Sequence, residues 1–158
     1  MPNQNANRVT LLVLMGLTAT GVSGCATTPE TATTSATQSV AATVWTLEAI
    51  YTPADNTNVA LSADLKPRHT VQFEDGRLVL QLDCNRGFAN WAGEFPKPGT
   101  VQDLSIDRVA SSRALCPGPS YGEQMARDLP GAQKFGLSVE GDELVIITNN
   151  AQYRFLKP

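Results

Sequence analysis

The chain has 158 residues, of which 12 are Lys or Arg and 15 are Asp or Glu, so its formal net charge at pH 7 is −3. The basic residues are dispersed along the sequence and form no basic cluster, so we expect no nucleic-acid partner. Without its first 25 residues the chain keeps 11 basic and 15 acidic residues. The remaining length suits one domain rather than two.

Residues 1–25 have the order of a secretory signal peptide. Arg8 gives a positive start, Val9–Val22 is mostly apolar but short for a bilayer span, and small residues precede Cys25. The tetrapeptide Val22-Ser23-Gly24-Cys25 resembles the lipobox of bacterial lipoproteins. That resemblance implies that the peptide before Cys25 is removed and that acyl chains on Cys25 attach the protein to a membrane. The alternative is an ordinary signal peptide in which the cysteine has no role.

Residues 26–42 are short and polar, with one charged side chain and no apolar periodicity, which predicts a flexible stalk. Together the two segments predict a lipid-anchored protein of the cell envelope. Ala26 follows the lipidated cysteine and resembles an outer-membrane sorting signal of Gram-negative bacteria. We therefore expect the outer membrane, with the domain facing the periplasm. In a Gram-positive organism the same sequence implies the outer face of the cytoplasmic membrane.

From Thr43 onward the pattern is mainly that of strands. Alternating apolar residues predict strands over residues 43–50, 69–73, 77–83, 88–95, 100–106, 134–140, 143–148 and 152–156, with a loop over 53–67. Asp75-Gly76 and Gly141-Asp142 are hairpin signals. A helix is expected over 119–129, where Ser120 and Glu123 have the spacing of a capping box. These elements predict a mainly β fold, a small antiparallel barrel-like or strongly curved sheet of seven to eight strands with one packed helix.

The apolar residues that share the expected inner face of this sheet are bulky, so we expect a packed interior rather than a ligand cavity. They are Trp45, Leu47, Val71, Phe73, Leu78, Leu80, Leu82, Leu144, Ile146, Tyr153 and Phe155. Phe88, Trp91 and Phe95 offer the alternative of an aromatic cavity lining. Phe88 and Trp91 differ in strand parity, however, so they cannot share a face without a bulge, and core packing is the commoner role.

Cys84 and Cys116 are the two cysteines that lipidation would leave. An exported domain meets oxidising conditions, in which two remaining thiols usually form a disulfide. Two free thiols are the second interpretation. A metal or nucleophile site is the third, but it would need histidine partners, and His69 is the only histidine. The sequence also lacks a Gly-x-Ser-x-Gly motif, a phosphate-binding glycine loop and metal-ligand spacings, so we expect no cofactor, no metal and no enzymatic activity.

Several motifs follow one another in an order that resembles the META domain of HslJ-like bacterial envelope proteins. They are Trp45-Thr46-Leu47, Cys84-Asn85-Arg86, Trp91 with Gly93, Ser111–Pro117, Glu123 with Leu129, and Gly141–Leu144. The resemblance covers residues 43–158 and implies a small, mostly antiparallel barrel-like sheet with a packed helix. Asp83 stands where the family usually has Gly, which argues against a positive φ at this position. The family is associated with stress response, drug tolerance or secretion and has no established catalytic activity.

Asn85, Arg86 and Arg113 lie within a few residues of the two cysteines, so a disulfide would bring them together at one rim of the sheet. One interpretation is a cationic rim that binds an anionic ligand or a protein partner. The simpler interpretation, which we favour, is that Asn85 forms an Asx-type turn and Arg86 pairs with Asp83 or Glu94 in water.

The sequence as a whole predicts a non-catalytic, lipid-anchored envelope protein, connected with stress, that acts by binding an envelope partner. One alternative is a carrier of a small apolar ligand inside the barrel. Another is a protease inhibitor that presents a rigid loop such as Phe95–Thr100.

Overall fold

The computed structural model describes residues 42–158, which contain eleven strands, one α-helix and two short 3-10 helices. The strands are β1 (Val44–Thr52), β2 (Thr57–Ala60), β3 (His69–Phe73), β4 (Arg77–Leu82), β5 (Asn85–Ala92), β6 (Val101–Asp103), β7 (Ser105–Ile106), β8 (Ala110–Ser111), β9 (Ala132–Leu137), β10 (Glu143–Thr148) and β11 (Gln152–Leu156). The helices are α2 (Gly122–Asp128), η1 (Lys66–Arg68) and η2 (Leu129–Gly131). The predicted signal peptide with Cys25, and all but the last residue of the predicted stalk, lie outside the described residues.

All the paired strands are antiparallel, and nine of them form a continuous path in the order β6-β9-β10-β11-β1-β3-β4-β5-β7. The result is a mainly β domain with a strongly curved, half-barrel sheet and one helix, as the sequence predicts. The strand count exceeds the expected seven to eight. Three differences account for the excess. β2 lies in the segment expected to be a loop, the single strand expected over 100–106 is divided at Leu104 into β6 and β7, and β8 has two residues and therefore carries no readable alternation.

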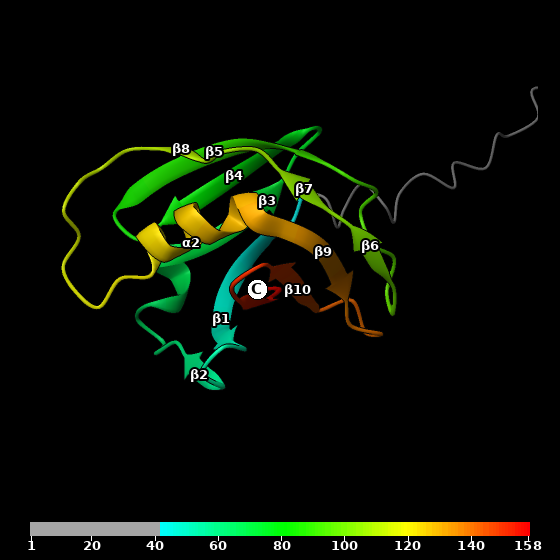
Figure 1. Ribbon diagram of the computed structural model, residues 1–158, viewed down its shortest axis with the longest axis horizontal. Coiled ribbons are helices and arrows are strands. Elements are labelled where there is room, and N and C mark those ends of the chain that lie inside the picture. Colours follow the sequence, from blue (N-terminus) through cyan, green and yellow to red (C-terminus); the bar gives the residue numbers. More distant parts are fainter. Residues whose placement is uncertain (1–41) are drawn as a thin grey trace, which may run out of the picture. The chain divides into compact units, whose positions relative to one another are not determined.

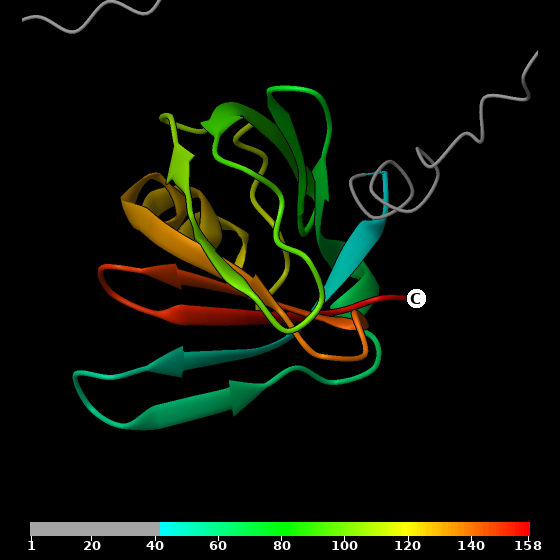
Figure 2. The same cartoon turned by 90° about the vertical axis from the view of Figure 1, so that its right-hand side faces the viewer.

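Strand β1 belongs to two parts of the sheet at once. Its first residues pair with β3, its later residues Ala49–Thr52 pair with β2, and β11 lies along its other edge. A register shift between Leu47 and Ala49 marks a β-bulge, which bends the strand. In Figure 2 the β1–β2 hairpin accordingly extends away from the strongly curved part of the sheet.

The segment Val101–Ile106 connects the two ends of the sheet. Its first part, β6, pairs with β9, and its last part, β7, pairs with β5. Between them the Leu104 N–H donates a hydrogen bond of 3.0 Å to the Gln133 carbonyl. Strand β8 lies further along the same edge of β5, and β5 is its only strand partner within residues 42–158. Helix α2 lies in the curve of the sheet on this side (Figure 1).

The interior is filled by side chains from alternate strand positions, as strand geometry requires when one face is covered. All eleven residues expected on the inner face are at most 2% exposed, which confirms that part of the prediction. Met125 and Leu129 add two fully buried side chains from the helical segment. Trp91 packs edge-on against Phe73, with ring centroids 5.0 Å apart, whereas Phe88 lies on the outer face, as its parity predicts.

The start of α2 differs from the sequence prediction. The helix begins at Gly122 rather than near Pro119, and Ser120 does not cap it, because Tyr121 occupies the N-cap position without a side-chain bond. The start is set by a tertiary contact instead. A Cβ atom on Gly122 would lie 2.4 Å from the backbone oxygen of Leu82, so only glycine lets the helix approach β4 this closely.

The end of α2 is fixed by a buried polar pair. The Tyr153 hydroxyl on β11 donates a hydrogen bond of 2.8 Å to the carboxylate of Asp128, the last helix residue. Burial and this hydrogen bond raise the pKa of Tyr153 far above its usual value, so the phenol keeps its proton and remains a donor.

Candidate functional site

The turn between β4 and β5 is built on a left-handed residue. Asp83 has a φ of 63°, which corrects the expectation that an aspartate here argues against a positive φ. Aspartate tolerates this region better than most residues because its short side chain can bond locally. Here the carboxylate is buried and forms an ion pair with Arg68. Asp83 therefore keeps the backbone conformation that suits glycine and adds an electrostatic contact.

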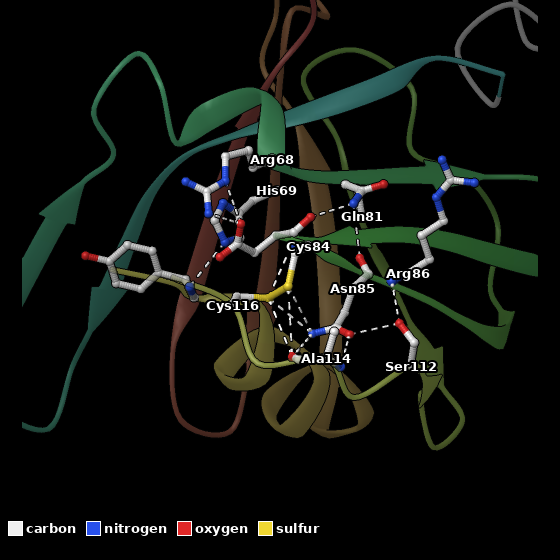
Figure 3. The surroundings of a disulfide bond; sticks show 11 residues. Arg68, His69, Gln81, Cys84, Asn85, Arg86, Ser112, Ala114 and Cys116 are labelled. Atoms are coloured by element: carbon white, nitrogen blue, oxygen red, sulfur yellow. Dashed lines mark hydrogen bonds and ion pairs between the residues drawn. A yellow bond between two sulfur atoms is a disulfide. The ribbon is translucent and has the colours of Figure 1, made fainter. Parts of the chain in front are cut away.

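Cys84 follows this turn and forms a disulfide with Cys116, with the two Cα atoms 5.6 Å apart (Figure 3). This is the pairing expected from the two cysteines that lipidation would leave. The bond fastens the connection between β8 and α2, residues 112–121, to the β4–β5 turn.

Asn85 holds the same connection through its side chain. Its Oδ1 accepts hydrogen bonds from the Ser112 hydroxyl at 2.9 Å and from the Ala114 N–H at 2.7 Å. Its Nδ2 donates to the Ala114 carbonyl at 3.0 Å and contacts the Cys116 sulfur at 3.3 Å. Asn85 is 7% exposed, so it is a buried clamp between two chain segments rather than the exposed Asx-type turn expected from the sequence (Figure 3).

His69 fixes the far end of the connection. The Tyr121 N–H donates a hydrogen bond of 3.1 Å to its Nε2, while its Nδ1 faces the Leu65 carbonyl at 2.9 Å. A carbonyl only accepts and an amide N–H only donates, so the pattern assigns the proton to Nδ1 and a lone pair to Nε2. His69 has no exposed surface. Its role is therefore structural, because it holds Tyr121, the residue that precedes α2.

A groove of about 440 Å³ lies between the chain around β8 and helix α2. The chain before and after β8 forms one wall, the outward side of α2 forms the other, and residues at the ends of β4 and β5 form the base. The lining residues are Leu82, Asn85, Arg108, Val109, Ser111, Ser112, Arg113, Gly122, Glu123, Ala126 and Arg127. We name this site the arginine groove, after Arg108, Arg113 and Arg127.

The arginine groove is cationic. Arg108 and Arg113 are exposed, and neither guanidinium forms an ion pair with any residue of the described range 42–158. Arg127 contacts the Asp128 carboxylate at 3.3 Å, and Glu123 is the one acidic residue of the lining. A guanidinium presents paired N–H donors that match the two oxygens of a carboxylate or phosphate. The groove therefore has the chemistry to bind an anionic group.

A second hollow of about 200 Å³ adjoins the groove and shares Leu82, Asn85 and Glu123 with it. The disulfide-linked connection forms its outer wall through Ala114, Leu115, Cys116 and Ser120. The Leu115 side chain is fully exposed on this wall. The groove therefore has an exposed apolar side chain beside it.

The three predicted rim residues have different positions relative to the groove. Arg113 lines the groove, Asn85 contributes to its base as a buried clamp, and Arg86 does not line it. The Arg86 side chain is turned away from Asn85 and Ser112 in Figure 3. It pairs with neither Asp83 nor Glu94, which corrects that expectation, because Asp83 is engaged by Arg68 on the other side of the turn.

Arg108 and Arg127 are groove residues that the sequence analysis missed. Arg108 lies in an irregular segment between two strands of two residues each, and Arg127 lies on the helix. Only the course of the 112–121 connection brings these positions to one groove. The sequence carries no periodic signal that could have identified them together.

Two further observations concern chemistry in the described part of the chain. Among residues 42–158, no three His, Cys, Asp or Glu side chains are arranged to hold a metal ion. In the same range no helix has the length and apolar character needed to span a membrane.

A strongly curved antiparallel sheet, filled by its own side chains and bordered by a cationic groove, places the protein among the small, mainly β domains. Within that class the chain belongs to the META domain family, whose pattern matches residues 38–158. A search among curated proteins gave no match. The NMR structure of a protein from Burkholderia xenovorans is similar, with 21% sequence identity over 78% of this chain and 86% of that chain and a TM-score of 0.57. At this identity the similarity supports the fold alone.

Proposed function

We propose that this META domain is the exported part of a lipid-anchored envelope protein that has no catalytic activity and acts by binding a partner. The observation that carries the proposal is the arginine groove, in which two exposed guanidinium groups have no ion-pair partner among residues 42–158. Unpaired arginines beside a well-formed groove are typical of sites that bind carboxylates or phosphates. A connection with envelope stress, implied by the resemblance to HslJ-like proteins, belongs to the same proposal.

The filled interior favours external binding over carriage of a ligand. A carrier of a small apolar molecule needs an open cavity lined by side chains that leave room for the guest. Here the inner face holds Trp45, Phe73, Phe135, Tyr153 and Phe155, all fully buried. Their size fills the curve of the sheet and therefore supports recognition on its outside.

The loop that suggested a protease inhibitor uses its aromatic residue for packing. Phe95 is half-buried, with ring centroids 5.4 Å from Phe73 and 5.5 Å from Phe135. A side chain held in this way is not presented to a protease, so the loop does not favour that alternative.

The anchor part of the proposal depends on Cys25, which lies outside the described residues. We predict that Cys25→Ser abolishes labelling with palmitate and leaves the unprocessed precursor, because the thiol that accepts the acyl chains is gone. Metabolic labelling and fractionation of the envelope measure both effects. The unmodified protein should fractionate with the outer membrane in a Gram-negative host. Undiminished palmitate labelling of the Ser variant would contradict the anchor.

The binding part is tested by photo-crosslinking in intact envelopes. A photoreactive amino acid is placed at Ser111, which lines the groove, and separately at Asp75, on the exposed turn between β3 and β4. We expect a discrete crosslinked species from Ser111 only, and its loss when Arg108→Glu and Arg113→Glu are added. No discrete species from Ser111, or identical products from both positions, would refute binding at the groove.

A further inference from the structure

The free edge of β8 gives the groove a second recognition element besides its charge. The Ser112 N–H donates to the Arg86 carbonyl, and Ala110 lies opposite Phe88, so the backbone groups of Ser112 and Ala110 face β5. In an antiparallel strand consecutive residues point their N–H and C=O groups to opposite sides. The backbone groups of Ser111 therefore face away from β5. No other strand within residues 42–158 takes them up.

An unpaired strand edge is a template for another strand, and proteins normally cover it or use it. Here Ser111 and Val109 both line the arginine groove, so the open edge borders the same space as the unpaired guanidinium groups. A chain that enters the groove can form main-chain hydrogen bonds with β8 and place its side chains against Arg108 and Arg113. Main-chain pairing supplies affinity, and the arginines select acidic side chains.

The lining favours a polypeptide over a polyanionic surface. Glu123 stands among the arginines, and the Asp128 carboxylate lies against Arg127. A dense array of phosphates would be repelled by these carboxylates, whereas a peptide can place acidic residues only where the arginines stand. The partly buried apolar side chains of Val109 and Ala126 in the lining also suit a peptide of alternating acidic and apolar residues.

We propose that the arginine groove binds an extended, acidic polypeptide segment, which adds a strand to the free edge of β8 with its carboxylates on Arg108 and Arg113. This inference rests on the proposed function, that the domain acts by binding a partner, and names the chemistry of that partner. The volume of about 440 Å³ accommodates a few residues of such a segment.

The test is a fluorescence-anisotropy titration of the full chain, purified in detergent, with a labelled ten-residue peptide of alternating Glu and Val. We expect saturable binding that is weakened about tenfold or more by Arg108→Glu with Arg113→Glu, since each substitution removes a charge-assisted pair. The matched control is Lys97→Glu with Lys157→Glu, which reverses two exposed charges outside the groove lining and should leave the affinity unchanged. Arg108→Gln with Arg113→Gln repeats the test if the doubly acidic variant has a lowered melting temperature.

Two further experiments complete the test. One distinguishes strand addition from binding by charge alone, and the other distinguishes a peptide ligand from a membrane surface. The same peptide with N-methyl groups on alternate residues, in both registers, cannot complete the ladder and should bind about tenfold more weakly. Equal affinity of the N-methylated peptides would overturn strand addition. Absence of peptide binding, together with arginine-dependent binding of phosphatidylglycerol vesicles, would overturn the proposal that the ligand is a polypeptide. Because crosslinking from Ser111 in intact envelopes is independent of the peptide chosen, a crosslink without peptide binding refutes this inference and leaves the proposed function standing.

Discussion

Asn85 holds the connection between β8 and α2 with one carboxamide, through its bonds to Ser112 and Ala114. A buried amide that satisfies both its donor and its acceptor side stabilises two segments at once, and removing it leaves backbone groups without partners. The place of Asn85 next to the disulfide could be predicted from the sequence, whereas its buried side chain could not, since an Asx-type turn was expected. Burial here depends on the 112–121 connection folding back over β5, which no local pattern shows.

We predict that Asn85→Ala lowers the free energy of unfolding by about 2 kcal/mol, because it leaves the Ala114 N–H and carbonyl unpaired. Urea denaturation measures the change, and hydrogen exchange should show faster exchange at Ala114. Asn90→Ala is the matched control, since Asn90 is exposed and its side chain makes one hydrogen bond, of 3.2 Å, to Asp107. Equal effects of the two substitutions would contradict the clamp.

Asp83 adopts a left-handed backbone conformation and also forms an ion pair with Arg68. Two substitutions separate the contributions of these two features to stability. Asp83→Ala and Asp83→Gly both remove the pair with Arg68, but only alanine must adopt the φ of 63° with a Cβ atom and no polar group. We predict that the alanine variant is less stable than the glycine variant by about 1 kcal/mol. Parallel urea denaturation of the two proteins gives the difference. Identical stabilities would show that the left-handed backbone places no demand on this position.

At the scale of elements, helix α2 shows where tertiary contact overrides a local signal. Ser120 and Glu123 have the spacing of a capping box, yet the helix starts at Gly122, against the backbone of Leu82. The Tyr121 N–H is taken by His69 from another part of the chain. The sequence therefore contains a capping signal, but the tertiary contact between Gly122 and Leu82 determines where the helix starts.

We predict that Gly122→Ala lowers the free energy of unfolding by about 2–3 kcal/mol, because its Cβ would force α2 away from β4. Gly118→Ala is the control, since no atom lies within 4 Å of a Cβ built there, and it should change stability by less than about 0.5 kcal/mol. Thermal unfolding followed by circular dichroism compares the two. A tolerated alanine at position 122 would contradict the close approach of helix and sheet.

Strands with clear alternation could be predicted, and those without it could not. Trp45 and Leu47 in β1 and the three leucines of β4 identify their inner faces because one face is covered. β8 is too short to show a period. The strand expected over 100–106 is divided into β6 and β7 because its two parts pair with different strands, β9 and β5. The groove was only partly predicted, through Asn85 and Arg113, because it depends on where the short strands and α2 meet.

At the scale of the whole molecule, the filled interior and the cationic groove together favour recognition on the surface over carriage of a ligand. The largest fully buried side chains include Trp45, Tyr153 and Phe73, and a core of this kind is packed to a density that leaves no room for a guest. The similar structure of the Burkholderia xenovorans protein supports the fold alone. We therefore propose that the domain acts through its surface, where the arginine groove presents guanidinium groups that have no ion-pair partner among residues 42–158.

The central claim is that the interior is filled and carries no ligand. Native mass spectrometry of the full chain purified from its host tests it most directly, because it measures the mass of the protein together with any bound molecule. We predict the mass of the processed, acylated polypeptide with its disulfide intact and no stoichiometric small molecule. A small apolar molecule retained at one copy per chain would contradict the packed interior and make the domain a carrier.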